Sequence, residues 1–368
     1  MSDPVLLYGA PDALPDLFHA IPVGIIDPFL YGETDGRRFA TVSSLDSDKV
    51  AAFGVEVLDP YTLGADELLA SGIARHLYEV EIALRACQEV GIDRALVPSE
   101  FPLGVADHLR KGGVALEVAP ETFVARRRAK TPEQLDGIRR AQAAADAAMG
   151  VAAELIHELR IGLTSEDVRE AMQTACAERG CELPDDVIVA GGAHGADGHE
   201  SGHGALRAGA PVVVDVWPRD GVSRCWADMT RTFVAGGGEP DAELAGYWDL
   251  CKTSLDRVHA GIRAGADASA LYRESCEPFI EAGQPTQLTK EPGTVLRDGY
   301  FHSLGHGVGL EVHERPNLGR SPDQLVAGDV IAVEPGCYRR GYGGCRLEDL
   351  VLVTDDGGEV LTDFPYDL

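Results

Sequence analysis

Two stretches of the chain resemble each other at an offset of 103 residues, and this internal repeat constrains the fold more than any other feature. Residues 158–172, ELRIGLTSEDVREAM, and residues 261–275, GIRAGADASALYRES, each contain a helix end, a glycine and a second helix start. Each copy leads into a β-rich stretch, at 211–234 and 329–353. Both stretches are predicted to form a hairpin, in which two strands rich in β-branched residues flank a turn containing proline and glycine. The sequence therefore predicts two copies of one helix-and-hairpin unit that face each other.

Acidic side chains occupy matching places in the two predicted hairpins. Asp215 and Asp228 are 13 residues apart, and Glu334 and Glu348 are 14 apart, so each hairpin carries one acid on each arm. The offsets between the copies, 119 and 120 residues, nearly agree, so we expect the four carboxylates to converge. Carboxylates about 4 Å apart repel by roughly 4 kcal/mol per pair at an effective dielectric near 20, so they take up protons or hold cations. The alternative is four ordinary surface acids, but their matching places favour a centre of two metal ions.

Residues 302–316, HSLGHGVGLEVHERP, carry three histidines among glycines, namely His302, His306 and His313. The glycines suggest a phosphate-binding loop, but the run has neither a lysine followed by Ser or Thr nor the spacing G-x-G-x-x-G. Three structural histidines are a second alternative. Neutral imidazole is a good ligand for divalent metals, so next to four converging acids this cluster favours metal binding.

The charge of the chain limits its partners. Lys and Arg total 32 against 60 for Asp and Glu, and the net charge of −28 repels nucleic acid and anionic lipid. There is no basic stretch followed by an apolar run at the start and no run of about eighteen apolar residues anywhere, so we expect a cytoplasmic protein. The eight cysteines contain no C-x-x-C pair and are expected to be mostly buried thiols, with Cys337 and Cys345 close enough to meet across a hairpin.

The length of 368 residues predicts about two domains. Short apolar strands alternate with helical stretches over the first 125 residues, which predicts a small α/β domain. The basic stretch ARRRAK at 125–130 is interpreted as the domain boundary. The predicted elements are strands at 22–26, 37–43 after the Asp35-Gly36 turn, 94–99 and 113–119, and a helix around 76–90.

A long alanine-rich helix is predicted after the boundary. Thr131 is its expected N-cap, Pro132 its first residue and Gln134 the partner that closes a capping box. Gly162 is the expected stop signal.

The motifs DMTRTF, HSLGHGVGLEVHE, AVEPGCY and CRLEDLVLVT, in this order, resemble those of the superfamily of aminopeptidase P, prolidase, methionine aminopeptidase and creatinase. The resemblance is strong over 126–368, whereas the first 125 residues match only in size and strand–helix alternation. It implies an α+β fold, with a smaller creatinase-like N-terminal α/β domain at 1–125 and a C-terminal pita-bread catalytic domain at 126–368.

This resemblance implies five metal ligands and two divalent ions per chain. The ligands fall on Asp215, Asp228, His306, Glu334 and Glu348. Hard oxygen ligands with one imidazole suit manganese first, with cobalt, zinc or iron as alternatives. Glu334 is also expected to take a proton from water and pass it to the departing proline nitrogen.

Other roles follow from the same resemblance. His313 would contact the scissile carbonyl, His302 would line the pocket after the cleaved bond, and His199 would bind substrate, with His203 as a rival for that place. Two residues would hold ligands in place without touching the metal: Arg346 would orient Glu348, and Thr230 would orient Asp228.

Two positions depart from the family pattern. Trp217 stands where a small residue is common, which adds bulk next to a ligand. Asn317 stands where some prolidases have an arginine that binds the substrate carboxylate, and Arg315 or Arg320 is the expected substitute.

The resemblance implies an enzyme that forms a homodimer and acts on short proline-containing peptides. We expect an Xaa-Pro dipeptidase, with an Xaa-Pro aminopeptidase as the alternative. A creatinase-like hydrolase, a lyase or a binding module on the same fold is a third possibility.

Overall fold

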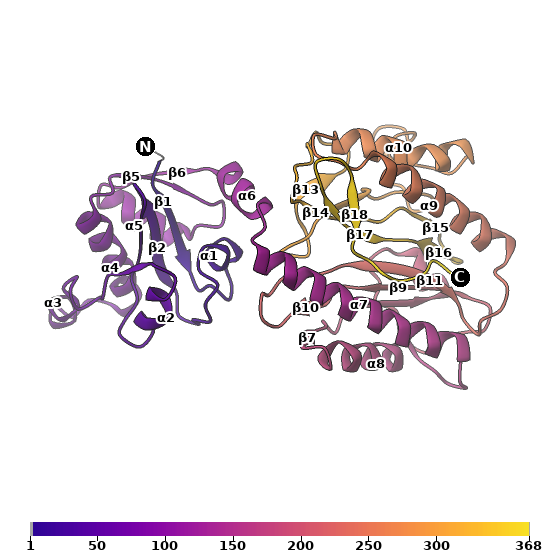
Figure 1. The fold of residues 1–368 in the computed structure, drawn as a ribbon, viewed down its shortest axis with the longest axis horizontal. Helices are drawn as coiled ribbons and strands as arrows, with labels where there is room; N and C mark the ends of the chain where they lie inside the picture. Colours follow the sequence, from indigo (N-terminus) through magenta and orange to yellow (C-terminus); the bar gives the residue numbers. More distant parts are fainter. Residues whose placement is uncertain (1–2, 368) are drawn as a thin grey trace. The chain divides into compact units, whose positions relative to one another are not determined.

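The computed structural model describes residues 3–367, and the chain divides into two compact units, 1–127 and 128–368 (Figure 1). Each unit has hydrophobic clusters of its own. No helix within the described residues is long and apolar enough to cross a membrane.

The N-terminal unit is a six-stranded mixed sheet with helices on both faces. Successive residues of the central strand point to opposite faces, so Leu6 packs with Ala83 of α4 (Arg75–Val90) and Leu7 packs with Leu17 of α1 (Pro15–Ala20). The strands, in their order across the sheet, are β4 (Glu56–Val57), β3 (Arg37–Ala40), β2 (Phe29–Thr34), β1 (Val5–Gly9), β5 (Arg94–Val97) and β6 (Ala115–Val118). The helices are α1 (Pro15–Ala20), α2 (Ser47–Ala51), α3 (Ala65–Ala70), α4 (Arg75–Val90), α5 (Leu103–Lys111) and α6 (Pro120–Arg128).

Most of the elements predicted here are present. Strands β3, β5 and β6 and helix α4 lie where the sequence predicts them, and Asp35 and Gly36 form the β2–β3 turn with positive φ values of 47° and 78°. The strand predicted at 22–26 is wrong. Pro22 has no N–H to donate to a ladder and the N–H of Val23 bonds locally to Ile21, so Val23 and Ile25 are buried without strand pairing.

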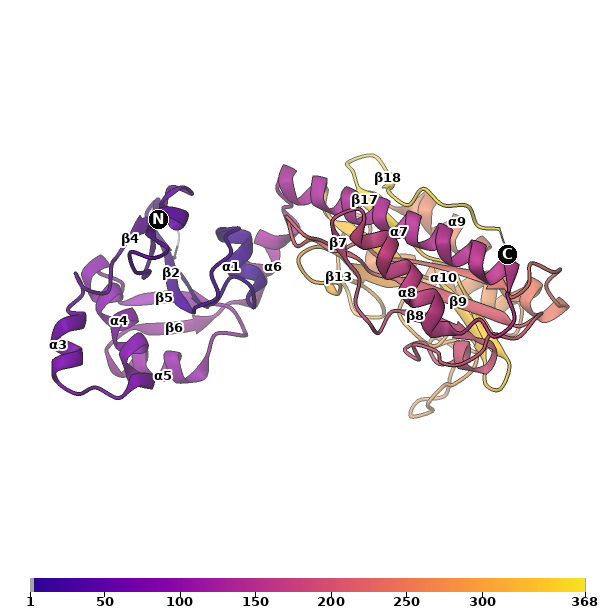
Figure 2. The ribbon, with the colours of Figure 1, turned by 90° about the horizontal axis from the view of Figure 1, so that it is seen from below.

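The C-terminal unit places its sheets between two pairs of helices (Figures 1 and 2). One pair is α7 (Pro132–Glu158) and α8 (Ser165–Ala177), which share a core with β8 (Ile188–Gly191), β9 (Pro211–Val216) and β11 (Met229–Val234). The other pair is α9 (Ala242–Gly261) and α10 (Ala268–Glu281), which share a core with β14 (Val330–Val333) and β17 (Asp349–Val353). Both copies of the repeat therefore give a helix pair packed on an antiparallel strand pair, as predicted.

The remaining elements complete two larger sheets and two two-stranded sheets, β7 with β10 and β15 with β16. The first sheet has the order β11-β9-β8 and the second the order β13-β12-β14-β17-β18. The other elements are β7 (Cys181–Glu182), η1 (Gly192–Ala196), β10 (Arg219–Asp220), β12 (Gly305–Gly307), β13 (Glu314–Leu318), β15 (Gly336–Arg339), β16 (Gly343–Arg346) and β18 (Gly358–Val360).

Both hydrogen bonds of the predicted capping box of α7 are present. Thr131 accepts from the backbone N–H of Gln134, whose side chain accepts from the N–H of Thr131. The predicted stop is wrong by three residues. Leu159, rather than Gly162, ends the helix in the left-handed conformation, with φ 38°, and Gly162 lies in the turn that follows.

The second predicted hairpin is more elaborate than a simple turn. Val333 of β14 pairs with Asp349 of β17, but the residues between the arms form their own antiparallel pair, β15 with β16. Cys337 and Cys345 lie directly opposite each other in this inner pair. All eight cysteines are buried free thiols.

Candidate metal centre

The five predicted ligands lie in or next to strands that meet at one place. Asp215 is in β9, Asp228 immediately precedes β11, and His306 is the middle residue of β12. Glu334 follows β14 and Glu348 precedes β17. The two sheets are joined here, because the N–H of Glu348 donates to the carbonyl of Thr230 at 3.0 Å.

Distances between ligand atoms are short. His306 Nε2 lies 3.7 Å from Asp228 Oδ2 and 3.9 Å from Glu334 Oε1. Ligand atoms of Asp228, His306 and Glu348 all lie within 4.8 Å of one another. The joining of the two sheets thus gathers Asp228, His306 and Glu348 in a space the size of one ion's coordination shell.

The glycines on either side of His306 allow close approach of strands. A Cβ at Gly305 would lie 1.9 Å from the carbonyl oxygen of Ala332, and one at Gly307 would lie 2.3 Å from that of Arg315. These glycines are therefore strand residues that seat His306 between β13 and β14, and they do not form a phosphate loop.

Burial and mutual repulsion change the titration of the acids. Burial raises the pKa of Asp228 well above its usual range, and the charges of Glu348, Asp215 and Glu334 raise it further. The pKa of Glu348 is raised in the same way, by burial first and then by Asp215. Burial raises the pKa of Glu334 to about 8, although the positive charge of Arg346 opposes the shift. The cluster therefore binds either protons or cations at neutral pH.

Carboxylate oxygens without partners among the described residues and a neutral imidazole fit the binding of a cation. Within residues 3–367, the buried atoms Asp215 Oδ1 and Asp228 Oδ1 have no hydrogen-bond partner. Burial lowers the pKa of His306 to about 4, so this ring is neutral and has a lone pair to offer a cation. His306 Nδ1 lies 3.2 Å from the carbonyl of Gly307, which orients the ring with Nε2 towards the acids.

Arg346 and Thr230 support the acids in a different arrangement from the predicted one. Arg346 Nη2 donates to Asp215 Oδ2 at 2.5 Å, and its Nε donates to Thr230 Oγ1 at 3.1 Å. Thr230 in turn donates to Glu348 Oε2 at 2.6 Å. The prediction that Arg346 orients Glu348 and Thr230 orients Asp228 is corrected accordingly. Thr230 faces Glu348 because the sheets join here.

Three further histidines border the acids. Burial lowers the pKa of His302 to about 3, and the charges of Arg346 and His199 act in the same direction. Burial also lowers the pKa of His313, followed by the effect of His199, and the His313 ring lies edge-on to that of His306 with centroids 4.1 Å apart. These effects place His199 near both His302 and His313. His203 instead stacks on His194, with centroids 4.2 Å apart, so the structure favours His199 over its rival.

Tyr338 belongs to this site and was not predicted. Its hydroxyl lies 3.0 Å from His302 Nε2 and accepts a 3.0 Å hydrogen bond from Arg346 Nη1. The signal was present, since Tyr338 ends the motif AVEPGCY, but nothing in the sequence indicates that β15 turns this ring towards His302.

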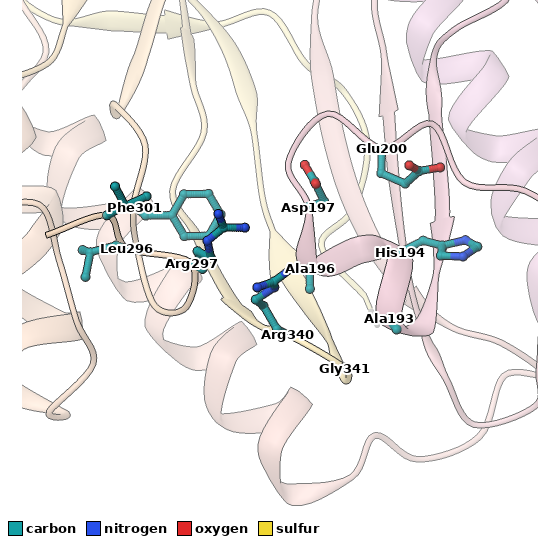
Figure 3. A pocket seen from close by; sticks show the side chains of 11 residues that line it. Ala193, His194, Ala196, Asp197, Glu200, Leu296, Arg297, Phe301, Arg340 and Gly341 are labelled. Atoms are coloured by element: carbon teal, nitrogen blue, oxygen red, sulfur yellow. The ribbon is translucent and has the colours of Figure 1, made fainter.

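A cavity of about 480 Å³ opens next to these residues (Figure 3). Phe301 forms part of its wall, and the Phe301 ring also packs on His302 and Tyr338 with centroids 5.9 and 5.1 Å apart. Arg297 and Arg340 direct their guanidinium groups into the cavity, and neither forms a salt bridge with a described residue. Other lining residues are Ala193, His194, Ala196, Asp197, Glu200, Val295, Leu296 and Gly341.

Of the two arginines predicted to replace the missing one at position 317, Arg315 has a carboxylate partner, whereas Arg320 is exposed and stays a prediction. Arg315 Nε donates to Asp323 Oδ2 at 2.6 Å. Arg320 lies near Tyr272 of α10, whose pKa its charge lowers against the larger effect of burial. Asn317 and Trp217 are where the sequence places them, after His313 and directly after β9, and Trp217 is partly buried.

The fold and the carboxylate-rich site together define a metallopeptidase of the pita-bread type. The model of metallopeptidase family M24 matches residues 136–355, and the chain belongs to this family.

Individual relatives agree with the family. The probable dipeptidase PepE of Mycobacterium tuberculosis H37Rv is 33% identical over 277 residues, which cover 74% of this chain and 68% of the relative. The Xaa-Pro dipeptidase of Pyrococcus furiosus is 31% identical over 236 residues, covering 63% of this chain and 62% of the relative.

Solved structures match almost the whole chain. The Xaa-Pro dipeptidase from Bacillus anthracis has a TM-score of 0.82 at 22% identity, covering 100% of this chain and 94% of that one. The X-Pro aminopeptidase from Thermotoga maritima has a TM-score of 0.81 at 20% identity, covering 99% and 96%. At these identities the likeness shows the fold alone.

Proposed function

We propose that this chain is a two-metal Xaa-Pro dipeptidase that cleaves the peptide bond before proline in dipeptides. The proposal rests on one observation, the convergence of four carboxylates and an imidazole with three further histidines around them. Relatives named Xaa-Pro dipeptidase and dipeptidase support the substrate class.

The proposed ligands are the five residues Asp215, Asp228, His306, Glu334 and Glu348. Manganese is the first choice of metal, because four of the five ligands offer hard oxygen atoms, and cobalt, zinc or iron are alternatives. When bound, two such ions lower the pKa of a shared water from 15.7 towards about 7 and so supply hydroxide at neutral pH.

Side chains of the protein transfer the proton, stabilise the developing charge and hold the ligands in place. The carboxylate of Glu334 accepts a proton from the attacking water and passes it to the proline nitrogen as the C–N bond breaks. His313 donates a hydrogen bond to the carbonyl oxygen, where negative charge develops. Arg346 and Thr230 hold Asp215 and Glu348 in fixed orientations while this happens.

Recognition of the proline ring is assigned to the part of the site that contains His302. An Xaa-Pro bond has no N–H to donate, so the site needs shape and apolar contact in place of a backbone hydrogen bond. His302, Tyr338 and Phe301 form a connected set of rings that suits the proline ring. His199 is assigned to the substrate on the opposite side of this space.

Recognition of the free carboxylate is assigned to Arg297 and Arg340. A dipeptide differs from a longer peptide by the carboxylate that follows proline directly, and guanidinium groups bind carboxylates well. In a chain of net charge −28, two arginines that form no salt bridge with the described residues and share one cavity are suited to an anionic group.

The alternative is an Xaa-Pro aminopeptidase, which the likeness to the Thermotoga maritima structure keeps open. The decisive measurement is kcat/KM for an Xaa-Pro dipeptide, its amide and an Xaa-Pro-Yaa tripeptide. A dipeptidase loses activity on the amide and on the tripeptide. If neither change lowers kcat/KM, the aminopeptidase takes its place, and equal cleavage of Xaa-Ala would remove the proline preference.

The remaining assignments concern the oligomeric state, the compartment and the domains of the enzyme. We propose a homodimer in the cytoplasm, with residues 1–125 as a creatinase-like domain and 126–368 as the catalytic domain. Eight free thiols support a reducing compartment, and the net charge of −28 argues against nucleic acid and membrane surfaces as partners. Sedimentation of the purified protein tests the dimer.

A further inference from the structure

A second group of metal-ligating side chains lies outside the centre described above. Ligand atoms of His194, Glu200 and His203 all lie within 4.8 Å of one another. The rings of His194 and His203 stack at 26° with centroids 4.2 Å apart, and His203 Nδ1 lies 3.4 Å from Glu200 Oε1. Figure 3 shows His194 and Glu200 on the side of the cavity opposite Arg297.

The backbone that carries Glu200 and His203 is held in place. Arg169 of α8 donates to the carbonyls of Ser201 and Gly202 at 2.6 and 3.0 Å. Gly202 has a φ of 77°, and a Cβ there would lie 2.1 Å from the carbonyl oxygen of Val189, so this segment packs closely on β8. The main chain is therefore fixed before any ligand arrives, which lowers the entropy cost of binding.

The side chains themselves keep room to adjust. Those of His203 and Glu200 are 69% and 41% exposed. Nitrogen and oxygen ligands bind zinc at about 2.0–2.2 Å, which places ligand atoms roughly 3.4 Å apart in a tetrahedral site. Because the stacked rings direct their nitrogens nearly parallel to each other, the exposed His203 ring must rotate out of the stack to bring its nitrogen towards the ion.

We propose that His194, Glu200 and His203 form a further binding site for one divalent transition-metal ion, with water in the remaining positions. Two imidazoles and one carboxylate favour zinc, nickel or copper over manganese, whereas the centre at His306 is dominated by oxygen ligands. The two sites therefore prefer different ions. This inference does not depend on the proposed peptidase activity.

The location gives the ion an influence on the substrate. His199 lies between His194 and Glu200 in the sequence, so an ion held by these residues links both sides of the segment that carries His199. Binding of the ion restricts the motion of this segment next to the cavity.

Counting bound nickel in the full-length protein tests the site. The wild-type protein, first loaded with manganese, is equilibrated with micromolar Ni²⁺, and bound metal is measured by elemental analysis. The double variant H194A/H203A should bind one Ni²⁺ fewer than the wild type, and His76→Ala, an exposed histidine in α4, should match the wild type.

Two further variants keep the test decisive. Glu200→Gln should weaken the additional ion by more than about tenfold, because it removes a charged ligand. His306→Ala should lose metal from the main centre and still take up the additional nickel ion, which separates this proposal from the proposed function. Equal nickel content in the wild type and in H194A/H203A at every concentration would overturn the proposal.

Discussion

Arg346 donates a 2.5 Å hydrogen bond to Asp215 and joins the two copies of the repeat inside the C-terminal unit. Asp215 belongs to β9 of the first copy and Arg346 to β16 of the second. Both side chains are buried, and the other nitrogens of Arg346 bond to Thr230 and Tyr338. One guanidinium thus offsets part of the repulsion among four acids and fixes two neighbours of the metal centre.

Removing this guanidinium should destabilise the protein strongly. We expect Arg346→Gln to cost about 3–5 kcal/mol in the free energy of unfolding, because it leaves Asp215 buried without its partner. Urea unfolding of the metal-free protein measures this cost. Arg339→Gln, which breaks an exposed ion pair with Glu243, is the control and should change stability little. Similar losses in the two variants would contradict the role of Arg346.

Metal and activity should be lost together when a ligand is removed. His306→Ala and Asp228→Asn should each lower metal content below the expected two ions per chain and abolish hydrolysis, because each removes a donor from the centre. Elemental analysis and hydrolysis of an Xaa-Pro dipeptide measure both properties. Glu291→Gln, an exposed acid, should retain metal and activity. The ligand assignment is wrong if either ligand variant keeps both ions and normal turnover.

His313 should act on the reaction and not on metal binding. His313→Ala is expected to keep its metal ions and to lower kcat by about 10²–10³-fold, the usual cost of losing a hydrogen bond to developing charge. KM should change much less than kcat. A parallel loss of metal would make His313 a ligand instead.

The metal-free protein should lose stability as the pH rises. The carboxyl of Glu334 has a pKa of about 8 in the folded state against an ordinary value of 4.5, so the folded state binds the proton more tightly than the unfolded state. The stabilisation from this proton is complete below pH 4.5 and is lost as the pH rises towards 8. Thermal unfolding between pH 5 and 9 in EDTA should show a falling midpoint. Glu334→Gln should reduce this slope without abolishing it, because the raised pKa values of Asp228 and Glu348 act in the same direction. An unchanged slope in that variant would refute the assignment to Glu334.

The two arginines in the cavity should decide the preference for dipeptides. We expect Arg297→Ala and Arg340→Ala to raise KM for an Xaa-Pro dipeptide at least about tenfold while kcat stays near the wild-type value, since a charged hydrogen bond contributes about 1.5–3 kcal/mol. The amidated dipeptide should be cleaved equally by variant and wild type. Arg263→Ala, an exposed arginine that does not line the cavity, is the control. If the variants leave the ratio of dipeptide to amide unchanged, the carboxylate binds elsewhere.

The repeat and the convergence of its acids could be predicted from the sequence because each depends on local pattern and spacing. Thr131 with Gln134 and Asp35 with Gly36 specify their cap and turn through neighbours in the chain. Asp215 and Glu334 were found because the repeat places them at equivalent positions.

Features that depend on how the two copies meet could not be predicted. Whether Arg346 reaches Asp215 or Glu348 depends on the joining of two sheets, which no spacing encodes. The contacts of Tyr338 in β15 and the grouping of His194 in η1 with His203 arise in the same way, from segments that meet only in three dimensions. The segment at 22–26 shows the converse case, since two of its apolar residues, Val23 and Ile25, are buried without strand pairing.

Because every cysteine is buried, alkylation of a cysteine reports the opening of the unit that contains it. Burial raises the pKa of Cys87 and of Cys225 to about 12, so in the closed protein these sulfurs resist alkylation at neutral pH. Cys87 is the one cysteine of the N-terminal unit, and the other seven belong to the C-terminal unit. A pulse of alkylating reagent followed by peptide mass analysis therefore distinguishes which unit opens first, without any engineered label.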